Sequence, residues 1–393
     1  MIQKLKYLKD HKGFVKYIKN TSWLFVEKIV QLMVGLFVSI WLARYLGPEQ
    51  LGLLRYSQSF VAIFGAIATL GLDVILVREL VKHENKRDEL IGTAFVMQFV
   101  GVIFILLLIV ISINFTSNDY YTNTLIFIIA SAQIFKPFIV IDFYFQSKVL
   151  SRYVVYARVT SLLLSSILKV ILILNNAPLI AFAWVFLFNA IISALGFIYF
   201  YINKSNNKLS NWKFKKSVAF SLLKDSWPLI LGGIAIAINL NVDKLMINEF
   251  LGSKYVGFYA AAMSFTAVFA MVPHMITQSI FPSYVNAHKK NNELFLSRIR
   301  KGYKILFYIS LLFVIITLFS SKYLILMTYG VEFQESIQIL NLTVISILFN
   351  SIGAINSLYF QVKNMQKKMM NRQWINVFVN IILNYFLIIN WVY

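Results

Sequence analysis

Nine ionisable side chains selected from the long apolar runs of this chain indicate what chemistry the protein can perform. The lysines are Lys28, Lys136, Lys169 and Lys244, and the other five residues are Glu27, Asp73, Asp142, Asp243 and His274. A charge at the centre of a bilayer costs about 2.5–3.5 kcal/mol on insertion scales, so such residues pair with one another or face a water-filled cavity. These residue types predict binding of charged groups or proton transfer rather than covalent catalysis.

Residues for other kinds of site are missing from the sequence. The chain has no cysteine, which excludes disulfides, thiolate metal sites and cysteine nucleophiles. Its four histidines lack the spacing of metal ligands, and there is neither a phosphate-binding loop nor an H-E-x-x-H motif. The longest predicted loops, near 203–226 and 286–302, are basic and too short to fold as a catalytic domain. We therefore expect no enzyme and no metal site.

The elements that position the nine residues are predicted to be membrane-spanning helices. Apolar residues make up 59% of the chain and charged residues 13%, whereas charged residues approach a quarter of a soluble protein. Apolar runs of about 20 residues are continuous, whereas the strands of a barrel would alternate. The predicted fold class is all-α, a bundle of eleven spans: 22–46, 56–80, 90–114, 123–146, 153–174, 177–202, 227–250, 255–285, 303–328, 337–362 and 373–391.

The basic residues are distributed unevenly between the two sides of this predicted bundle. Of 37 lysines and arginines, 29 fall on the side of the N-terminus, four on the opposite side and four within spans. Under the positive-inside rule this bias predicts a cytoplasmic N-terminus. The net charge of +21 is thus an orientation signal that also favours anionic lipid headgroups, and no nucleic-acid partner is expected. The first span is too long for a cleavable signal peptide.

An internal repeat relates the two halves of the sequence. The stretch "YLGPEQLGLLRYSQSF", residues 45–60, matches "FLGSKYVGFYAAAMSF", residues 250–265, at a shift of 205 positions. A second pair, "YFQSK" at 144–148 and "YFQVK" at 359–363, matches at a shift of 215 positions. Both matches keep their orientation in the membrane, so the halves are predicted to be parallel repeats. In the first stretch, Gly47 and Pro48 should break the helix and Gly52 should permit tight re-entry.

The repeat predicts a plan of six helices in each half. The expected parts are a cytoplasmic interfacial segment at 1–21, an N-terminal six-helix lobe at 22–202, a basic linker at 203–226 and a C-terminal lobe at 227–393. Because span six begins near residue 177, its partner should begin near residue 392, where this sequence stops. The C-terminal lobe is therefore expected to have five of its six helices, either through truncation or because the protein has eleven helices.

Several landmarks resemble the polysaccharide biosynthesis family, the Wzx-type O-antigen flippases of the multidrug/oligosaccharidyl-lipid/polysaccharide (MOP) exporter superfamily. In order they are "YLGPEQLGLLRYSQS", "GLDVILVREL", "DFYFQSK", "NVDKLMINEFLGSKYVGFYAAAMSF", "FPSY" and "YGVEFQESIQIL". The resemblance implies a MATE-like fold with two lobes around a central cavity. It also implies a multi-pass protein of the bacterial inner membrane that moves undecaprenyl-diphosphate-linked oligosaccharide, an O-antigen or capsule repeat unit, to the periplasmic leaflet by alternating access.

The resemblance further implies contacts with membrane lipids and glycan polymerase or chain-length machinery, and coupling to H+ or Na+, with no other cofactor. A cation-coupled multidrug or small-molecule exporter of the same superfamily is the alternative. A membrane glycan polymerase or transferase would need a sizeable extracytoplasmic loop, which the sequence lacks.

Within this resemblance, the intramembrane lysines are expected to make the cavity cationic for the diphosphate or for acidic sugars. Lys136, directly before Pro137 and nearest the midplane, is the foremost candidate. The alternative is neutral pairing within the bundle, of Lys28 with Glu27 or Asp73 and of Lys244 with Asp243. His274 follows Pro273 in the middle of a span, where the two could form a proton-coupled hinge or the histidine could simply be hydrogen-bonded in the interior.

Overall fold

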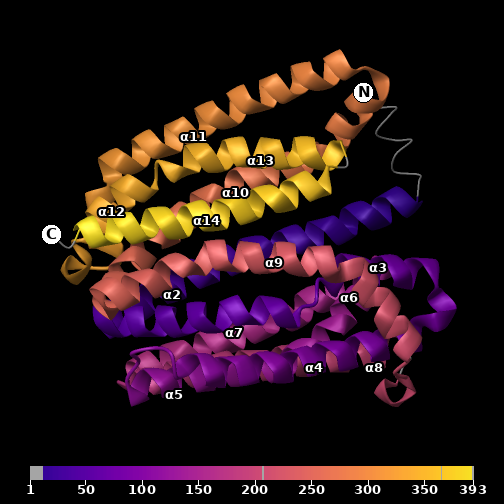
Figure 1. Ribbon diagram of the computed structural model, residues 1–393, viewed down its shortest axis with the longest axis horizontal. Helices are drawn as coiled ribbons and strands as arrows, with labels where there is room; N and C mark the ends of the chain where they lie inside the picture. The colour runs from indigo at the N-terminus through magenta and orange to yellow at the C-terminus, as the bar shows by residue number, and fades with distance from the viewer. Residues whose placement is uncertain (1–11, 206–207, 364, 392–393) are drawn as a thin grey trace. The chain divides into compact units, whose positions relative to one another are not determined.

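The structure is a computed structural model that describes residues 12–205, 208–363 and 365–391. The regular secondary structure of these residues is helical, with no strand, which confirms the all-α prediction (Figure 1). The elements are α2 (Lys12–Ala68), α3 (Leu72–Lys82), η1 (Glu84–Lys86), α4 (Arg87–Ile113), α5 (Tyr120–Ser131), η2 (Ala132–Ile139), α6 (Val140–Ser147), α7 (Arg152–Leu174), α8 (Leu179–Ser205), η3 (Leu209–Asn211), α9 (Lys216–Leu251), α10 (Ser253–Lys290), α11 (Asn292–Thr328), η4 (Val331–Phe333), α12 (Ser336–Thr343), α13 (Ser346–Val362) and α14 (Gln366–Trp391). Of the predicted interfacial segment, residues 1–11 lie outside the described residues.

Nine helical stretches in the described part of the chain are long and apolar enough to cross a membrane. The first, Asn20–Lys82, contains two of the predicted spans, 22–46 and 56–80. The last predicted span, 373–391, lies on α14, which is not one of the nine. The chain is therefore a multi-pass membrane protein, while the count of eleven spans and the missing twelfth helix stay predictions.

Two glycines separated by the repeat distance of 205 positions break the helices in the same way. Gly47 has φ 69° and ψ 174° inside α2, and Gly252 has φ 90° and ψ 170° between α9 and α10. Residues with a Cβ rarely adopt a positive φ, so glycine is needed at both places. After Gly47 the helix resumes at once through Pro48, which lacks an N–H and suits the first turn of a helix. The predicted break is confirmed.

Tertiary contacts divide the described chain into two compact units. The first unit comprises the described residues within 1–39 and 57–241, and the second comprises those within 40–56 and 242–393. Helix α2 contributes to both, because its segment 40–56 packs with the second unit. The lobes expected from the sequence, 22–202 and 227–393, remain a prediction.

Inside the second unit the repeated glycines pack against each other's segments. A Cβ on Gly52 would overlap the carbonyl oxygen of Ser253 and would lie 2.9 Å from the backbone nitrogen of Gly257. A Cβ on Gly257 would overlap the carbonyl oxygen of Pro48, which is the repeat counterpart of Ser253. The contact is reciprocal, as expected for two copies of one plan, and it explains why both positions are glycine.

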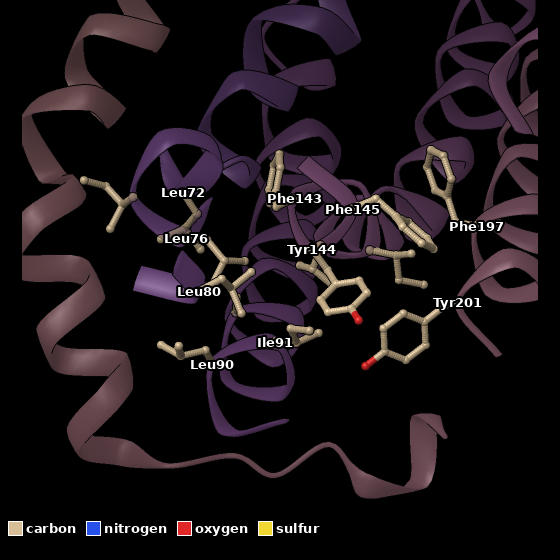
Figure 2. Close-up of a cluster of buried hydrophobic side chains, with 14 of the residues drawn as sticks. Leu72, Leu76, Leu80, Leu90, Ile91, Phe143, Tyr144, Phe145, Phe197 and Tyr201 are labelled. Carbon is tan, nitrogen blue, oxygen red and sulfur yellow. The ribbon is translucent and has the colours of Figure 1, made fainter. Parts of the chain in front are cut away.

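The core of the first unit joins α3, α4, α6 and α8 in a buried apolar cluster. Figure 2 shows Tyr144 and Tyr201 with their rings close together, and the ring centroids are 5.3 Å apart. Trp212 donates a hydrogen bond of 3.1 Å to the Tyr201 hydroxyl, so the polar end of this large buried side chain is satisfied. Leucines of α3 complete the cluster, among them Leu72 and Leu76. This packing holds α3 and α6, which carry residues of the site below.

Candidate functional site

A polar cavity of about 610 Å³ lies inside the first unit, among α2, α3, α4, η2, α6 and α7. Its lining includes the polar residues Asp73, Gln98, Lys136, Asp142, Gln146 and Arg158. Three of these, Asp73, Lys136 and Asp142, are among the nine residues selected from the sequence. The structure therefore brings together side chains from predicted spans two and four.

Two of the helices around the cavity are discontinuous, whereas the sequence predicted continuous spans at 56–80 and 123–146. Between α2 and α3 the chain leaves the helix at residues 69–71, where Leu70 has φ 51° and Gly71 has φ 56°. A Cβ on Gly71 would lie 2.8 Å from the Cβ of Leu229, so tertiary packing also requires glycine there. The Thr69 carbonyl at the break accepts a hydrogen bond of 3.4 Å from Gln98.

The second discontinuity is the 3₁₀ segment η2, which separates α5 from α6. Pro137 lies inside it and cannot donate the backbone hydrogen bond of a regular helix. Lys136 projects from this segment toward Gly65 on α2, where an added Cβ would lie 3.3 Å from the Lys136 Nζ atom. A glycine at position 65 thus leaves room for the lysine, a role that sequence reasoning did not assign.

An ion-pair network stands at one side of the cavity. The Arg158 guanidinium pairs with Asp142 on α6, and its Nη1 atom lies 3.5 Å from the Glu27 Oε1 atom on α2. Glu27 also accepts a hydrogen bond of 2.8 Å from Gln31, and Asp142 accepts one of 2.9 Å from Gln146. The two carboxylates are 1% and 2% exposed, and buried charges need such partners. The network therefore ties α2, α6 and α7 together.

Sequence reasoning missed Arg158, which it assigned to the cytoplasmic loops. A signal was present, because the residue falls within the predicted span 153–174. Glu27 pairs with this arginine and, among the described residues, makes no ion pair with Lys28, whose Nζ atom instead donates a hydrogen bond of 3.3 Å to the Gln31 side chain. Lys28 is exposed and does not line the cavity.

Lys136 is the cavity-lining cation that the network leaves unpaired. Its side chain is exposed to the cavity, and it makes no ion pair with any residue that the structure describes. Asp73 is also exposed there. The formal charges of the four ionisable lining residues balance, so the cavity is not cationic by net charge. The cavity can still bind an anion through the Lys136 ammonium group, which no carboxylate among the described residues neutralises.

The remaining candidates lie away from this cavity. Lys169 on α7 stands 5.5 Å from the ring centroid of Phe186, a cation–π contact within the first unit. Asp243 on α9, next to Lys244, accepts hydrogen bonds of 2.7 Å from Tyr259 on α10 and from Asn384 on α14 in the second unit.

His274 lines a separate cavity of the second unit and is exposed. Helix α10 continues through Pro273 as one helix. Among the described residues, no group of three or more His, Cys, Asp or Glu side chains is placed to hold a metal ion.

Discontinuous helices beside a cavity with polar lining residues are a feature that many secondary transporters share. Solved structures support that class of fold. An inward-facing MATE-family multidrug transporter of the MOP superfamily is similar, with a TM-score of 0.67, 16% identity, and 89% of this chain and 84% of that chain covered. The eukaryotic MATE transporter AtDTX14 is similar with a TM-score of 0.57, 13% identity and 96% of both chains covered. At these identities the similarity concerns the fold.

The family follows from the sequence comparison. Residues 17–288 match the family described as "Polysaccharide biosynthesis protein", and the chain belongs to this family. A curated Shigella flexneri protein named "Putative O-antigen transporter" is 23% identical over 354 residues, which are 86% of this chain and 83% of that protein. The resemblance read from the landmark motifs is confirmed.

Proposed function

We propose that the protein is a flippase that translocates an undecaprenyl-diphosphate-linked oligosaccharide, an O-antigen or capsule repeat unit, across the inner membrane. Its family and its transporter fold support this function. The observation that carries the proposal is Lys136, an exposed ammonium group that pairs with no carboxylate among the described residues and lines a cavity of about 610 Å³ within the first unit. A diphosphate needs such a cation when it leaves water.

In this mechanism the two kinds of charged residue have different tasks. Lys136 contacts the diphosphate, because its ammonium is the lining cation that remains available. Arg158 pairs with Asp142 and Glu27, so it positions α2, α6 and α7 around the cavity. Alternating access then requires the segments around the cavity to shift, and the helix breaks at 69–71 and in η2 are places where the backbone is not held by regular helical bonding. Asp73 is the exposed carboxylate available for coupling to H+ or Na+.

A cation-coupled exporter of drugs or other small molecules is the second candidate. Two observations favour it: the similar solved structures include multidrug transporters, and the formal charges that line the first cavity balance. A balanced lining does not by itself select for a doubly charged diphosphate.

Deletion of the gene, followed by analysis of membrane lipids, tests the proposal. A flippase predicts that undecaprenyl-diphosphate oligosaccharide accumulates on the cytoplasmic side and that surface glycan falls. Expression of the intact chain in the deletion strain should restore both. Unchanged surface glycan together with altered drug tolerance would reject the flippase and favour the exporter.

A further inference from the structure

A second polar cavity, of about 330 Å³, lies in the second unit between α10 and α13. Its lining includes His274, Thr277, Gln278, Phe281, Ser357 and Gln361. His274, Gln278 and Gln361 are exposed, and their side chains make no hydrogen bond within the described part of the chain. The volume is at the lower end of the range of about 300–1,000 Å³ for small-molecule pockets. The cavity thus presents free amide groups in a space of ligand size.

In the alignment of the two halves, lining residues of this cavity correspond to lining residues of the first cavity. Shifts of 205 positions for α2–α3 and 215 positions for η2–α6 carry lining residues of the first cavity onto lining residues of the second. The corresponding pairs are Thr69 and His274, Asp73 and Gln278, Ile139 and Ala354, Asp142 and Ser357, Phe143 and Leu358, and Gln146 and Gln361. Six such correspondences, from two separate stretches of chain, identify the two cavities as copies of one ancestral site.

The second copy has lost the charges of the first. The two acidic lining residues are replaced by Gln278 and Ser357, and the positions that correspond to Lys136 and Arg158 hold Ser351 and Gln373. Ser351 is buried and donates to the Leu348 carbonyl, so it presents no group to the cavity. Neutral residues therefore stand at the positions that correspond to the four ionisable lining residues of the first cavity.

The helix breaks at 69–71 and in η2 are also absent from the corresponding positions of the second copy. The counterpart of Gly71 is Ile276, which favours the right-handed helix, and α10 runs unbroken through it. The counterpart of Pro137 is Ile352, and the chain there is the regular helix α13 instead of a 3₁₀ segment. The wall of the second cavity is therefore made of continuous helices, which hold the two glutamines at constant positions.

We propose that this second cavity binds an uncharged sugar ring of the transported oligosaccharide, an inference that rests on the proposed flippase function. A sugar hydroxyl both donates and accepts, and so does each glutamine side chain. Phe281 offers an aromatic surface to the apolar face of a sugar ring. Neutral partners suit neutral hydroxyls, because a buried cation would need an anion to compensate it.

An anion site is the competing assignment, because one cation stands at the margin of the cavity. Arg372 on α14 donates a hydrogen bond of 3.3 Å to the Ser357 hydroxyl. Its guanidinium carbon also lies 5.6 Å from the Phe360 ring centroid. Arg372 is engaged in both of these contacts and is not among the residues that line the cavity. The test must still distinguish the two ligands.

Because the chain has no cysteine, single cysteines can be labelled without background. Thr69→Cys and His274→Cys form a matched pair, since both residues are exposed lining residues at corresponding positions of the repeat and neither is assigned to ligand binding. The purified full chain in lipid nanodiscs is labelled with a small methanethiosulfonate reagent, with N-acetylglucosamine or inorganic pyrophosphate as the probe. At a probe concentration ten times its Kd, an occupied cavity should be labelled about tenfold more slowly.

We expect the sugar to slow labelling of His274→Cys and to leave Thr69→Cys unchanged, with the opposite pattern for pyrophosphate. A Gln278→Leu substitution in the His274→Cys background should abolish protection by the sugar. The proposal is overturned if the sugar protects neither position or both equally, or if pyrophosphate protects His274→Cys. In that last case the second cavity is an anion site that uses Arg372.

This experiment reads binding in the purified protein and does not depend on transport in cells. Selective protection by sugar together with normal surface glycan after gene deletion would reject the proposed flippase function and support the sugar-binding cavity alone. Loss of surface glycan after deletion, without selective protection by the sugar, would reject the proposal for the second cavity and leave the flippase function supported.

Discussion

Replacing Lys136 by alanine should impair export without unfolding the protein. The side chain is exposed in the first cavity and makes no ion pair among the described residues, so its removal leaves no buried carboxylate without a partner. Substitutions that break no buried pair usually change the free energy of unfolding by less than about 0.5 kcal/mol. The variant should therefore accumulate in the membrane at the normal level.

The size of the binding defect follows from the exposure of this lysine. The Lys136 side chain is exposed to the first cavity, so a full low-dielectric Coulomb energy does not apply. A hydrogen bond to a charged group contributes about 1.5–3 kcal/mol, and its loss should weaken diphosphate binding by about 10- to 100-fold. Lys136→Met should behave like Lys136→Ala, because both lack the charge, whereas Lys136→Arg should keep part of the affinity.

Two measurements check this prediction. Protection of Thr69→Cys by inorganic pyrophosphate gives the affinity, and surface glycan in the deletion strain gives export when expression is kept limiting. Lys322→Ala is the matched control, because this lysine is exposed on α11 and lines none of the cavities described above. Wild-type affinity and export in Lys136→Ala would refute the assignment of the diphosphate to this residue.

Three further predictions concern stability, measured as unfolding of the purified protein in detergent. Arg158→Ala should cost about 3–5 kcal/mol, because it leaves two buried carboxylates without their cation, and a cost below 1 kcal/mol would contradict the described network. Gly52→Ala should lower the unfolding midpoint, since its Cβ would overlap a backbone carbonyl, whereas Gly232→Ala, whose Cβ meets nothing within 4 Å, should stabilise its helix by up to about 1 kcal/mol; equal effects would argue against the close contact. The Asp119 carboxylate accepts from the side chain and backbone N–H of the third residue of α5, which lowers its pKa below the usual range. A depressed pKa stabilises the fold above the ordinary aspartate value, so Asp119→Ala should cost about 1 kcal/mol at neutral pH. That difference should vanish as the pH falls through the lowered pKa, and a difference that persists in acid would reject the cap.

Part of the candidate site could be predicted because a charge in an apolar run is visible without any knowledge of contacts. Asp73, Lys136 and Asp142 were selected in this way, and the structure places all three on one cavity. The same rule also selected Lys169 and Lys244, which lie elsewhere. Hydropathy reports how deep a residue lies in the membrane, but it does not report which way the residue faces around the helix.

The helical, membrane-spanning character of the chain, the repeat of its halves and the helix break at Gly47 could all be predicted from the amino-acid sequence. These properties depend on the length of an apolar run, on matches between segments and on the freedom of glycine at positive φ, none of which requires knowledge of contacts. The pairing of Arg158 with Glu27, which is 131 positions away, and the break at residues 69–71 emerged from the three-dimensional structure. Ion pairs between helices and the packing of Gly71 against Leu229 depend on how distant segments meet, so no single stretch of sequence contains them.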